Sequence, residues 1–144
     1  MSLLDSPSLI DIKLYYKYVD AQGSKRLVIL EDSKAIAMLE DVEKGKGIEI
    51  LETKWGMLNW KEQNEVMDLS SQTVNPQTGE KRFNFLAYRD AIIKRCLRTW
   101  NLTMNEKPVT VSGDAIDSLP GPIVIDLYQK FEKMLEYSEE ELGN

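Results

Sequence analysis

Alternation of apolar and polar residues near the start of the chain predicts a strand with one buried face. The pattern covers residues 9–19, and its apolar side carries Ile10, Ile12 and Leu14. The polar, glycine-containing segment 20–25 then predicts a turn. The apolar run 27–30 predicts a second strand, which pairs with the first as an antiparallel hairpin. Residues 48–51 predict a third short strand, with an extension as far as Trp55 left open.

A broad amphipathic pattern runs from Asn84 to Leu102 and predicts a helix around which the rest of the chain packs. Its apolar residues recur at steps of three and four, as one face of a helix requires. They are Phe85, Leu86, Tyr88, Ile92, Ile93, Cys96, Leu97 and Trp100. Asn84 suits the N-cap position, because its side-chain oxygen can accept from a free backbone N–H group of the first turn. Such a helix is marginal alone in water, so we expect a core around it.

Two earlier helices are indicated by residues that favour helix starts. Ser33 is the expected N-cap of a helix that ends near Val42. Asn59, followed three residues later by Glu62, forms a capping-box pattern. The helix that this pattern opens is expected to reach Leu69.

The C-terminal part predicts a last helix that starts at Pro122, since proline is favoured at the first helical position. Its apolar stripe consists of Ile123, Leu127, Phe131, Met134 and Leu135. Residues 70–82 predict a surface loop that is long enough to be functional or mobile. Ser112 or Asp114 is expected to cap a short turn over 115–119.

These elements favour a single α+β domain over residues 1–144. An N-terminal part that contains the β-hairpin would pack on a mainly α-helical C-terminal part. The composition changes near Leu58, from β-rich to helical. Two subdomains, 9–58 and 59–144, therefore remain an alternative to one shared core. The length is sufficient for a stable interior without disulfides.

Charge and composition narrow the classes of function. The formal net charge of -6 favours solubility and argues against broad binding to nucleic acid or anionic membranes. The chain has no histidine, so the usual general base and the commonest transition-metal ligand are both missing. With one cysteine, no internal disulfide can form, and we expect no metal and no cofactor. Cys96 is either a buried, inert thiol or a reactive one.

Residues 1–13 have no basic n-region and no long apolar run, so we expect no signal peptide. No window approaches the roughly 20 apolar residues that cross a bilayer. These observations predict a cytosolic protein that does not bind membranes.

No spacing of residues indicates a catalytic site, and we expect a protein that is not an enzyme. The segment 44–47 combines lysine and glycine but lacks the spacing and the Lys-Ser/Thr pair of a phosphate-binding P-loop. A site with two carboxylates would depend on tertiary proximity, which a sequence does not give.

Two groups of residues are candidates for contact with partners. A third of the 18 Lys and Arg residues cluster at Lys81, Arg82, Arg89, Lys94, Arg95 and Arg98. They either pair with acidic groups, on this protein or a partner, or bind phosphates. The tryptophans Trp55, Trp60 and Trp100 are either core anchors or binding hot spots. The candidate partner-binding residues are Trp55, Trp60, Arg89, Arg95 and Arg98.

Four stretches, taken in order, carry a resemblance to a known family. They are KWGMLNWKEQNEV, YRDAIIKRCLRTWNLT, KPVTVSGDAIDSLP and GPIVIDLYQKFEKMLE. Over residues 54–137 the chain resembles a tail assembly chaperone of tailed bacteriophages, and assembly proteins of the phage baseplate and its hub are similar too. The resemblance implies a non-enzymatic role, in which the protein covers aggregation-prone parts of tail proteins such as the tape measure, the tube or baseplate components.

Four hypotheses follow. The first is a phage tail or baseplate assembly factor, acting in the host cell cytoplasm. The second is a stoichiometric structural subunit of the virion tail or baseplate. A nucleic-acid or regulatory adaptor and an enzyme are the others. A chaperone would be missing from purified particles, whereas a subunit would be present in a fixed number of copies.

Overall fold

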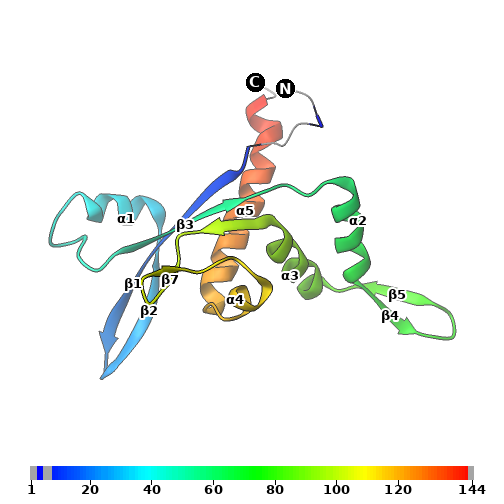
Figure 1. Ribbon diagram of the computed structural model, residues 1–144, viewed down its shortest axis with the longest axis horizontal. Coiled ribbons are helices and arrows are strands. Elements are labelled where there is room, and N and C mark those ends of the chain that lie inside the picture. The colour runs from blue at the N-terminus through cyan, green and yellow to red at the C-terminus, as the bar shows by residue number, and fades with distance from the viewer. Residues whose placement is uncertain (1–2, 5–7, 143–144) are drawn as a thin grey trace.

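The computed structural model describes residues 3–4 and 8–142, with side chains described as far as Glu136. The fold is α+β, as predicted: an antiparallel sheet formed mainly by the N-terminal half, followed by helices (Figure 1). The elements are β1 (Ile10–Ala21), β2 (Ser24–Leu30), α1 (Asp32–Leu39), β3 (Glu49–Trp55), α2 (Trp60–Leu69), β4 (Ser71–Asn75), β5 (Glu80–Phe83), α3 (Phe85–Cys96), β6 (Leu97–Trp100), β7 (Thr103–Met104), β8 (Lys107–Pro108), α4 (Gly113–Asp117) and α5 (Gly121–Leu142).

The main sheet has four strands in the order β2-β1-β3-β6, and every neighbouring pair is antiparallel. The predicted hairpin is confirmed, although its strands are longer than expected. They leave only Gln22 and Gly23 as the turn, with φ of 51° and 82°. Two positive φ values match the twist of the flanking strands, and glycine adopts the second at no steric cost.

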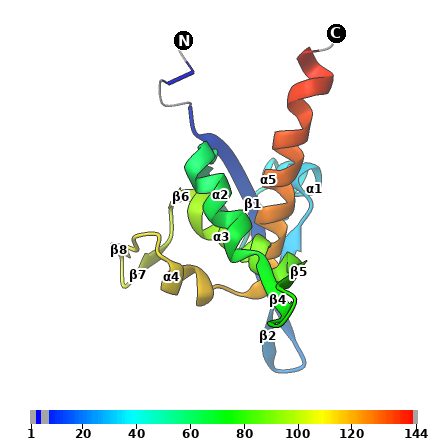
Figure 2. The same cartoon turned by 90° about the vertical axis from the view of Figure 1, so that its right-hand side faces the viewer.

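The two faces of the sheet differ in polarity. On the outer face, Lys13 lies opposite Glu52 and Asp11 lies opposite Lys54, with ion-pair distances of 3.9 and 3.2 Å. The inner face carries the alternate residues of β3, which are Leu51, Thr53 and Trp55. Helix α5 covers this inner face (Figure 2) and buries it in the main core.

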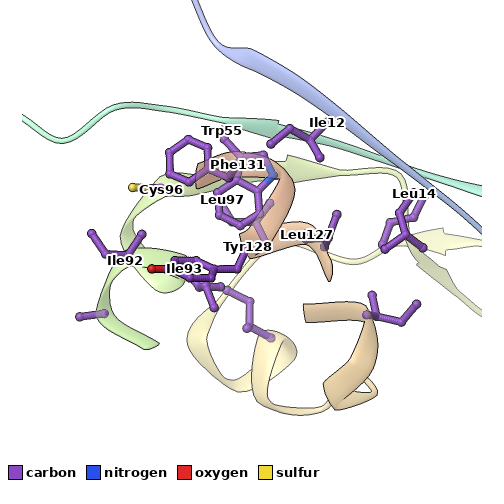
Figure 3. Close-up of a cluster of buried hydrophobic side chains, with 14 of the residues drawn as sticks. Ile12, Leu14, Trp55, Ile92, Ile93, Cys96, Leu97, Leu127, Tyr128 and Phe131 are labelled. Atoms are coloured by element: carbon purple, nitrogen blue, oxygen red, sulfur yellow. The ribbon is translucent and has the colours of Figure 1, made fainter. Parts of the chain in front are cut away.

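Trp55 and Phe131 form the centre of that core. Their rings stack with centroids 4.7 Å apart and an interplanar angle of 24° (Figure 3). The indole Nε1 of Trp55 donates to the Thr53 hydroxyl at 2.8 Å, and this hydroxyl donates to the Ile12 carbonyl at 2.7 Å. The polar groups of Thr53 and Trp55 are therefore satisfied, as a dry interior requires. Around them pack Leu14, Leu51, Val66, Ala91, Ile92, Ile93, Leu97, Ile116, Ile123, Leu127 and Tyr128.

A smaller cluster lies under α1 and consists of Tyr15, Leu30 and Ala35. Lys130 of α5 connects this region to the main body. Its ammonium group donates to the Lys13 carbonyl at 3.0 Å and to the Asp32 carboxylate at 2.7 Å, and lies 3.3 Å from the Asp126 carboxylate. One partly buried cation therefore joins α1, β1 and α5.

The predicted helix over 84–102 is wrong in its second part. Asn84 is the N-cap, with its side chain accepting from the Ala87 N–H, but the helix ends at Cys96. The next residues form β6, which pairs with the edge of β3, and Leu97 faces Trp55 in the register. The backbone N–H and C=O groups at the edge of β3 need hydrogen-bond partners, and β6 supplies them. A continued helix would bond its own backbone groups internally and leave that edge unpaired. The pattern of residues 97–100 suits a helix and a strand equally, so pairing with β3 determines that this segment is a strand.

The predicted loop over 70–82 is also wrong, because β4 and β5 form an exposed hairpin there. Gly79, with φ of 71°, lies in its turn. Its base is closed by the Asn84 N–H, which donates to the Ser70 carbonyl at 2.7 Å. The hairpin projects beside α2 and α3 (Figure 1).

Other helix boundaries differ in detail. Ser33 does not cap α1; Glu31 occupies the N-cap position without a side-chain cap bond, and the helix ends at Leu39. Ser112 is the residue that caps α4, through a bond from the Ala115 N–H. Helix α5 begins one residue before Pro122. Of its predicted stripe, Ile123, Leu127 and Phe131 are buried, whereas Met134 and Leu135 are 47% and 39% exposed.

The capping box of α2 is confirmed. The Asn59 side chain accepts from the Glu62 N–H at 2.8 Å, and the Glu62 carboxylate accepts from the Asn59 N–H at 3.2 Å. We expect Asn59→Ala to lower the free energy of unfolding by about 1 kcal/mol, because the first turn loses its side-chain acceptor. Urea denaturation measures this change. Asn59→Ser, which keeps an oxygen acceptor, serves as the control and should recover most of the loss.

Candidate partner-binding surface

An apolar groove of about 170 Å³ opens between α2, α3 and α5. Its walls come from three parts of the chain that the core brings together. The lining residues are Met57, Leu58, Gln63, Tyr88, Ile92, Cys96, Tyr128, Phe131, Glu132 and Leu135. A concave, mostly apolar site with a few polar groups at its edge is the usual form of a binding pocket.

Cys96 lines the groove, but its thiol is not poised for chemistry. It is 2% exposed, and burial raises the pKa of the Cys96 thiol to about 11. The thiolate is the reactive form of cysteine, and this environment disfavours it. Of the two hypotheses from the sequence, it therefore supports a buried, inert thiol over a reactive one.

Tyr128 and Glu132 supply the polar part of the wall. They lie one turn apart on α5, and the Tyr128 hydroxyl donates a hydrogen bond to the Glu132 carboxylate. Burial, and next this bond, raise the pKa of Tyr128 above its ordinary value. Tyr128 is thus a neutral hydrogen-bonding group rather than an acid–base group at physiological pH.

The two neighbouring tryptophans have opposite environments. Trp55 is 0% exposed within the core, so the hypothesis that its ring contacts a partner is wrong. Trp60 is the first residue of α2 and is 78% exposed. It lies one turn before Gln63, which lines the groove, so the two share a helix face. Met57, also at the groove, is 56% exposed.

The basic residues of α3 and β6 do not form one open patch. The Arg95 guanidinium donates to the Glu65 carboxylate at 2.7 Å, and Arg98 lies 3.9 Å from Glu62, so both attach to α2. Lys94 lies 3.2 Å from the carboxylate of Asp90 and 3.0 Å from that of Asp117. Arg95 and Arg98 therefore fit the interpretation of a charged face that pairs with acidic neighbours.

Arg89 differs from these residues. Its guanidinium lies over the Phe85 ring, 5.8 Å from the centroid, and no ion pair is formed by it within the described part of the chain. Of the five residues predicted from the sequence, Trp60 and Arg89 thus remain available to a partner.

Sequence reasoning missed the groove itself. Met57 and Tyr128 carry no distinct local signal, because one follows a strand and the other lies beside the apolar stripe of α5. A tyrosine such as Tyr128, with an apolar ring and one polar hydroxyl, is typical of the wall of a binding site. Only the tertiary packing shows that this side chain faces the groove.

The comparisons with known proteins give no family. Neither the models of known protein families, nor curated protein sequences, nor solved structures match the chain. Among the side chains that the structure describes, no group of three or more acidic or cysteine residues is arranged to hold a metal ion. In the same residues, no helix has the length and apolar character needed to cross a membrane.

Proposed function

We propose that the protein is a non-enzymatic assembly factor of a bacteriophage tail or baseplate that binds other tail proteins. The observation that carries this proposal is the apolar groove between α2, α3 and α5, with Trp60 and Met57 exposed beside it. The resemblance of residues 54–137 to tail assembly chaperones supplies the class of partner: tape-measure, tube or baseplate proteins.

The groove has the size and chemistry for an apolar segment of such a partner. A volume of about 170 Å³ accommodates one or two large side chains, and the walls are mostly apolar. An amphipathic helix that inserts its anchors into such a groove is a common mode of recognition. Trp60 and Met57 would then be covered, and exposed aromatic residues of this kind contribute most to binding.

The second candidate is a structural subunit of the virion tail or baseplate. The exposed β4–β5 hairpin favours this alternative, since its free strand edges can pair with a neighbouring subunit. The assembly factor would act in the host cytoplasm and be missing from purified particles. A subunit would be found in particles in a fixed copy number.

Co-expression with candidate tail proteins tests the assembly-factor proposal. The wild-type protein should copurify with one of them and raise its soluble yield. We expect Met57→Glu and Trp60→Glu together to reduce recovery by about tenfold or more, because a charge in an apolar contact must be desolvated.

Met104→Glu is the matched control, because Met104 lies in β7, is 69% exposed and is not among the residues that line the groove. Circular dichroism checks that all variants fold. Equal recovery of the partner with the groove variant and with this control would contradict the proposal.

A further inference from the structure

The free edge of strand β2 is a second surface, separate from the groove. The main sheet has the order β2-β1-β3-β6, so β2 pairs with β1 on one side only. The helices that cover this part of the sheet lie over its faces, α5 on the inner face and α1 on the outer one. The β1–β2 hairpin also projects from the body of the molecule (Figures 1 and 2). One side of β2 is therefore open to another strand.

The geometry of the hairpin determines which backbone groups of β2 face outwards. Ala21 pairs with Ser24 across the two-residue turn, and in such a turn the fourth residue donates to the first. Residues of an antiparallel strand direct their N–H and C=O groups to alternate sides. Ser24 faces β1, so Lys25, Leu27 and Ile29 direct their backbone groups to the free edge. Among the residues that the structure describes, no backbone group is bonded to these outward groups.

The edge of β2 is long and regular enough to pair with another strand. Seven consecutive residues of β2 pair with β1 without a bulge, and none of them is proline. Leu27, Val28 and Ile29 are half-buried and apolar. An edge of this kind pairs readily with another strand. The free edges of β4 and β5 are shorter, with five and four residues, and their register shifts after Thr73.

Opposite charges stand at the two ends of the β2 edge. Lys25 lies next to the turn, and Glu31 follows the strand in an extended conformation, with φ of -62° and ψ of 137°. Both side chains are exposed, and neither forms an ion pair with another side chain that the structure describes. Side chains alternate along a strand, so these two lie on the same face as Leu27 and Ile29. It is the inner face, because Leu27 and Ile29 pack against the main core.

A second copy of the strand complements this edge in one register. In an antiparallel pair, outward residues lie opposite outward residues, so the register changes only in steps of two. A twofold axis at Val28 sets Lys25 of each copy opposite Glu31 of the other, and Leu27 opposite Ile29. The neighbouring registers set Lys25 opposite Ile29, or Glu31 opposite Leu27, and so place a charged side chain against an apolar one. The edge is therefore complementary to itself in both charge and polarity.

We propose that two copies of this chain form a dimer by pairing their β2 strands antiparallel, which joins the two main sheets into one continuous sheet. Lys25 of each copy lies opposite Glu31 of the other, so the symmetric interface contains the same ion pair twice. Leu27 and Ile29 extend the apolar inner face across the junction. This inference does not rest on the proposed assembly function, since it concerns contacts between identical chains.

An open hollow at the end of β2 leaves room for the cation of the second copy. It has a volume of about 550 Å³ and lies between the end of β2 and α5. Its charged lining residues are Glu31, Asp32, Asp126, Lys130 and Lys133, a formal charge of 2 − 3 = −1. Oδ2 of Asp126 is buried there and accepts no hydrogen bond from the described residues, although the Lys130 ammonium lies 3.3 Å away. In the proposed register, Lys25 of the second copy reaches this end of the strand and balances the charge.

Charge reversal tests the dimer by sedimentation velocity on the full chain over a range of concentrations. The wild-type protein should sediment at high concentration as a dimer of the 16.5 kDa chain. Lys25→Glu alone, or Glu31→Lys alone, should raise the dimer dissociation constant by about tenfold or more, because each sets like charges opposite each other at both ends of the interface. An equimolar mixture of the two variants should restore dimerisation, because each variant then meets the opposite charge at both positions.

Amide hydrogen exchange locates the interface. In the dimer, the N–H groups of Leu27 and Ile29 should exchange more slowly than in the Lys25→Glu variant by about tenfold or more, because the second strand covers them. The N–H groups of Arg26 and Val28 face β1 and should be protected in both proteins. A dimer in which the Leu27 and Ile29 amides stay unprotected would have a different interface and would overturn the proposal.

Lys107→Glu and Glu106→Lys, in the β7–β8 hairpin, are the matched controls. Both residues are exposed, and the two changes give the same net charges as the two edge variants. Each control should dimerise as the wild-type protein does, and circular dichroism checks that all variants fold. A wild-type protein that stays monomeric at every concentration would contradict the proposal. A mixture no more dimeric than either edge variant, or controls that weaken the dimer equally, would contradict it as well.

Discussion

Replacing Trp55 with alanine is expected to lower the free energy of unfolding by about 3–5 kcal/mol, the usual cost of removing a buried aromatic ring. Trp55 is fully buried, stacks on Phe131 and donates to the Thr53 hydroxyl. The substitution leaves a cavity between the sheet and α5 and removes one partner of a buried hydroxyl. The total free energy of unfolding of a domain of this size is about 5–15 kcal/mol, so the substitution removes a large part of it.

Trp60→Ala provides the matched control, since the same residue type five positions later is mostly exposed. It should change stability by no more than about 0.5 kcal/mol. Urea denaturation followed by circular dichroism measures both variants. Equal losses for the two tryptophans would show that the environments described here are wrong.

Raising the pH above about 9 is expected to destabilise the protein progressively. Burial raises the pKa of the Cys96 thiol from 9.0 to about 11, and burial raises the pKa of Tyr16 from 10.0 to about 12. Each group therefore keeps its proton in the folded state at a pH where the unfolded chain has lost it. Their contributions are fully present below pH 9 and 10 respectively, and they are lost as pH rises through 11 and 12.

For Cys96 the loss should approach roughly 3 kcal/mol by the top of this window, since the shift is about two pKa units and each unit corresponds to about 1.4 kcal/mol. Unfolding free energies measured by urea titration from pH 8 upwards give the slope. Cys96→Ala starts from a lower stability because of its cavity, but it should show a shallower fall with pH. A slope identical to that of the wild-type protein would exclude Cys96 as the titrating group.

Some elements could be predicted because their signals are local. Alternation around Ile12 and Leu14 gives β1, and Gly23 gives its turn. The pairing of Asn59 with Glu62 defines the start of α2 within a single turn of chain. In each case, the residues that determine the structure lie within a few positions of it.

Other features depend on partners that are distant in the sequence. Residues 97–100 have a pattern that suits either a helix or a strand, and the free edge of β3, more than forty positions earlier, makes them a strand. The groove is likewise assembled from Met57, Tyr88 and Tyr128, which only tertiary packing brings together. Trp55 and Trp60 look alike in sequence, and only their burial separates a core residue from a surface one.

The place of α5 at the end of the described fold has a consequence for biosynthesis. The ribosome completes β1, β2 and β3 early, but the helix that covers their inner face follows only at residues 121–142. Until Phe131 emerges, the indole of Trp55 lacks the ring on which it stacks, and the inner face of the sheet is not yet covered by α5. During this interval the nascent polypeptide exposes apolar surface to which holdase chaperones can bind, and the inner face of the sheet is covered only when α5 docks.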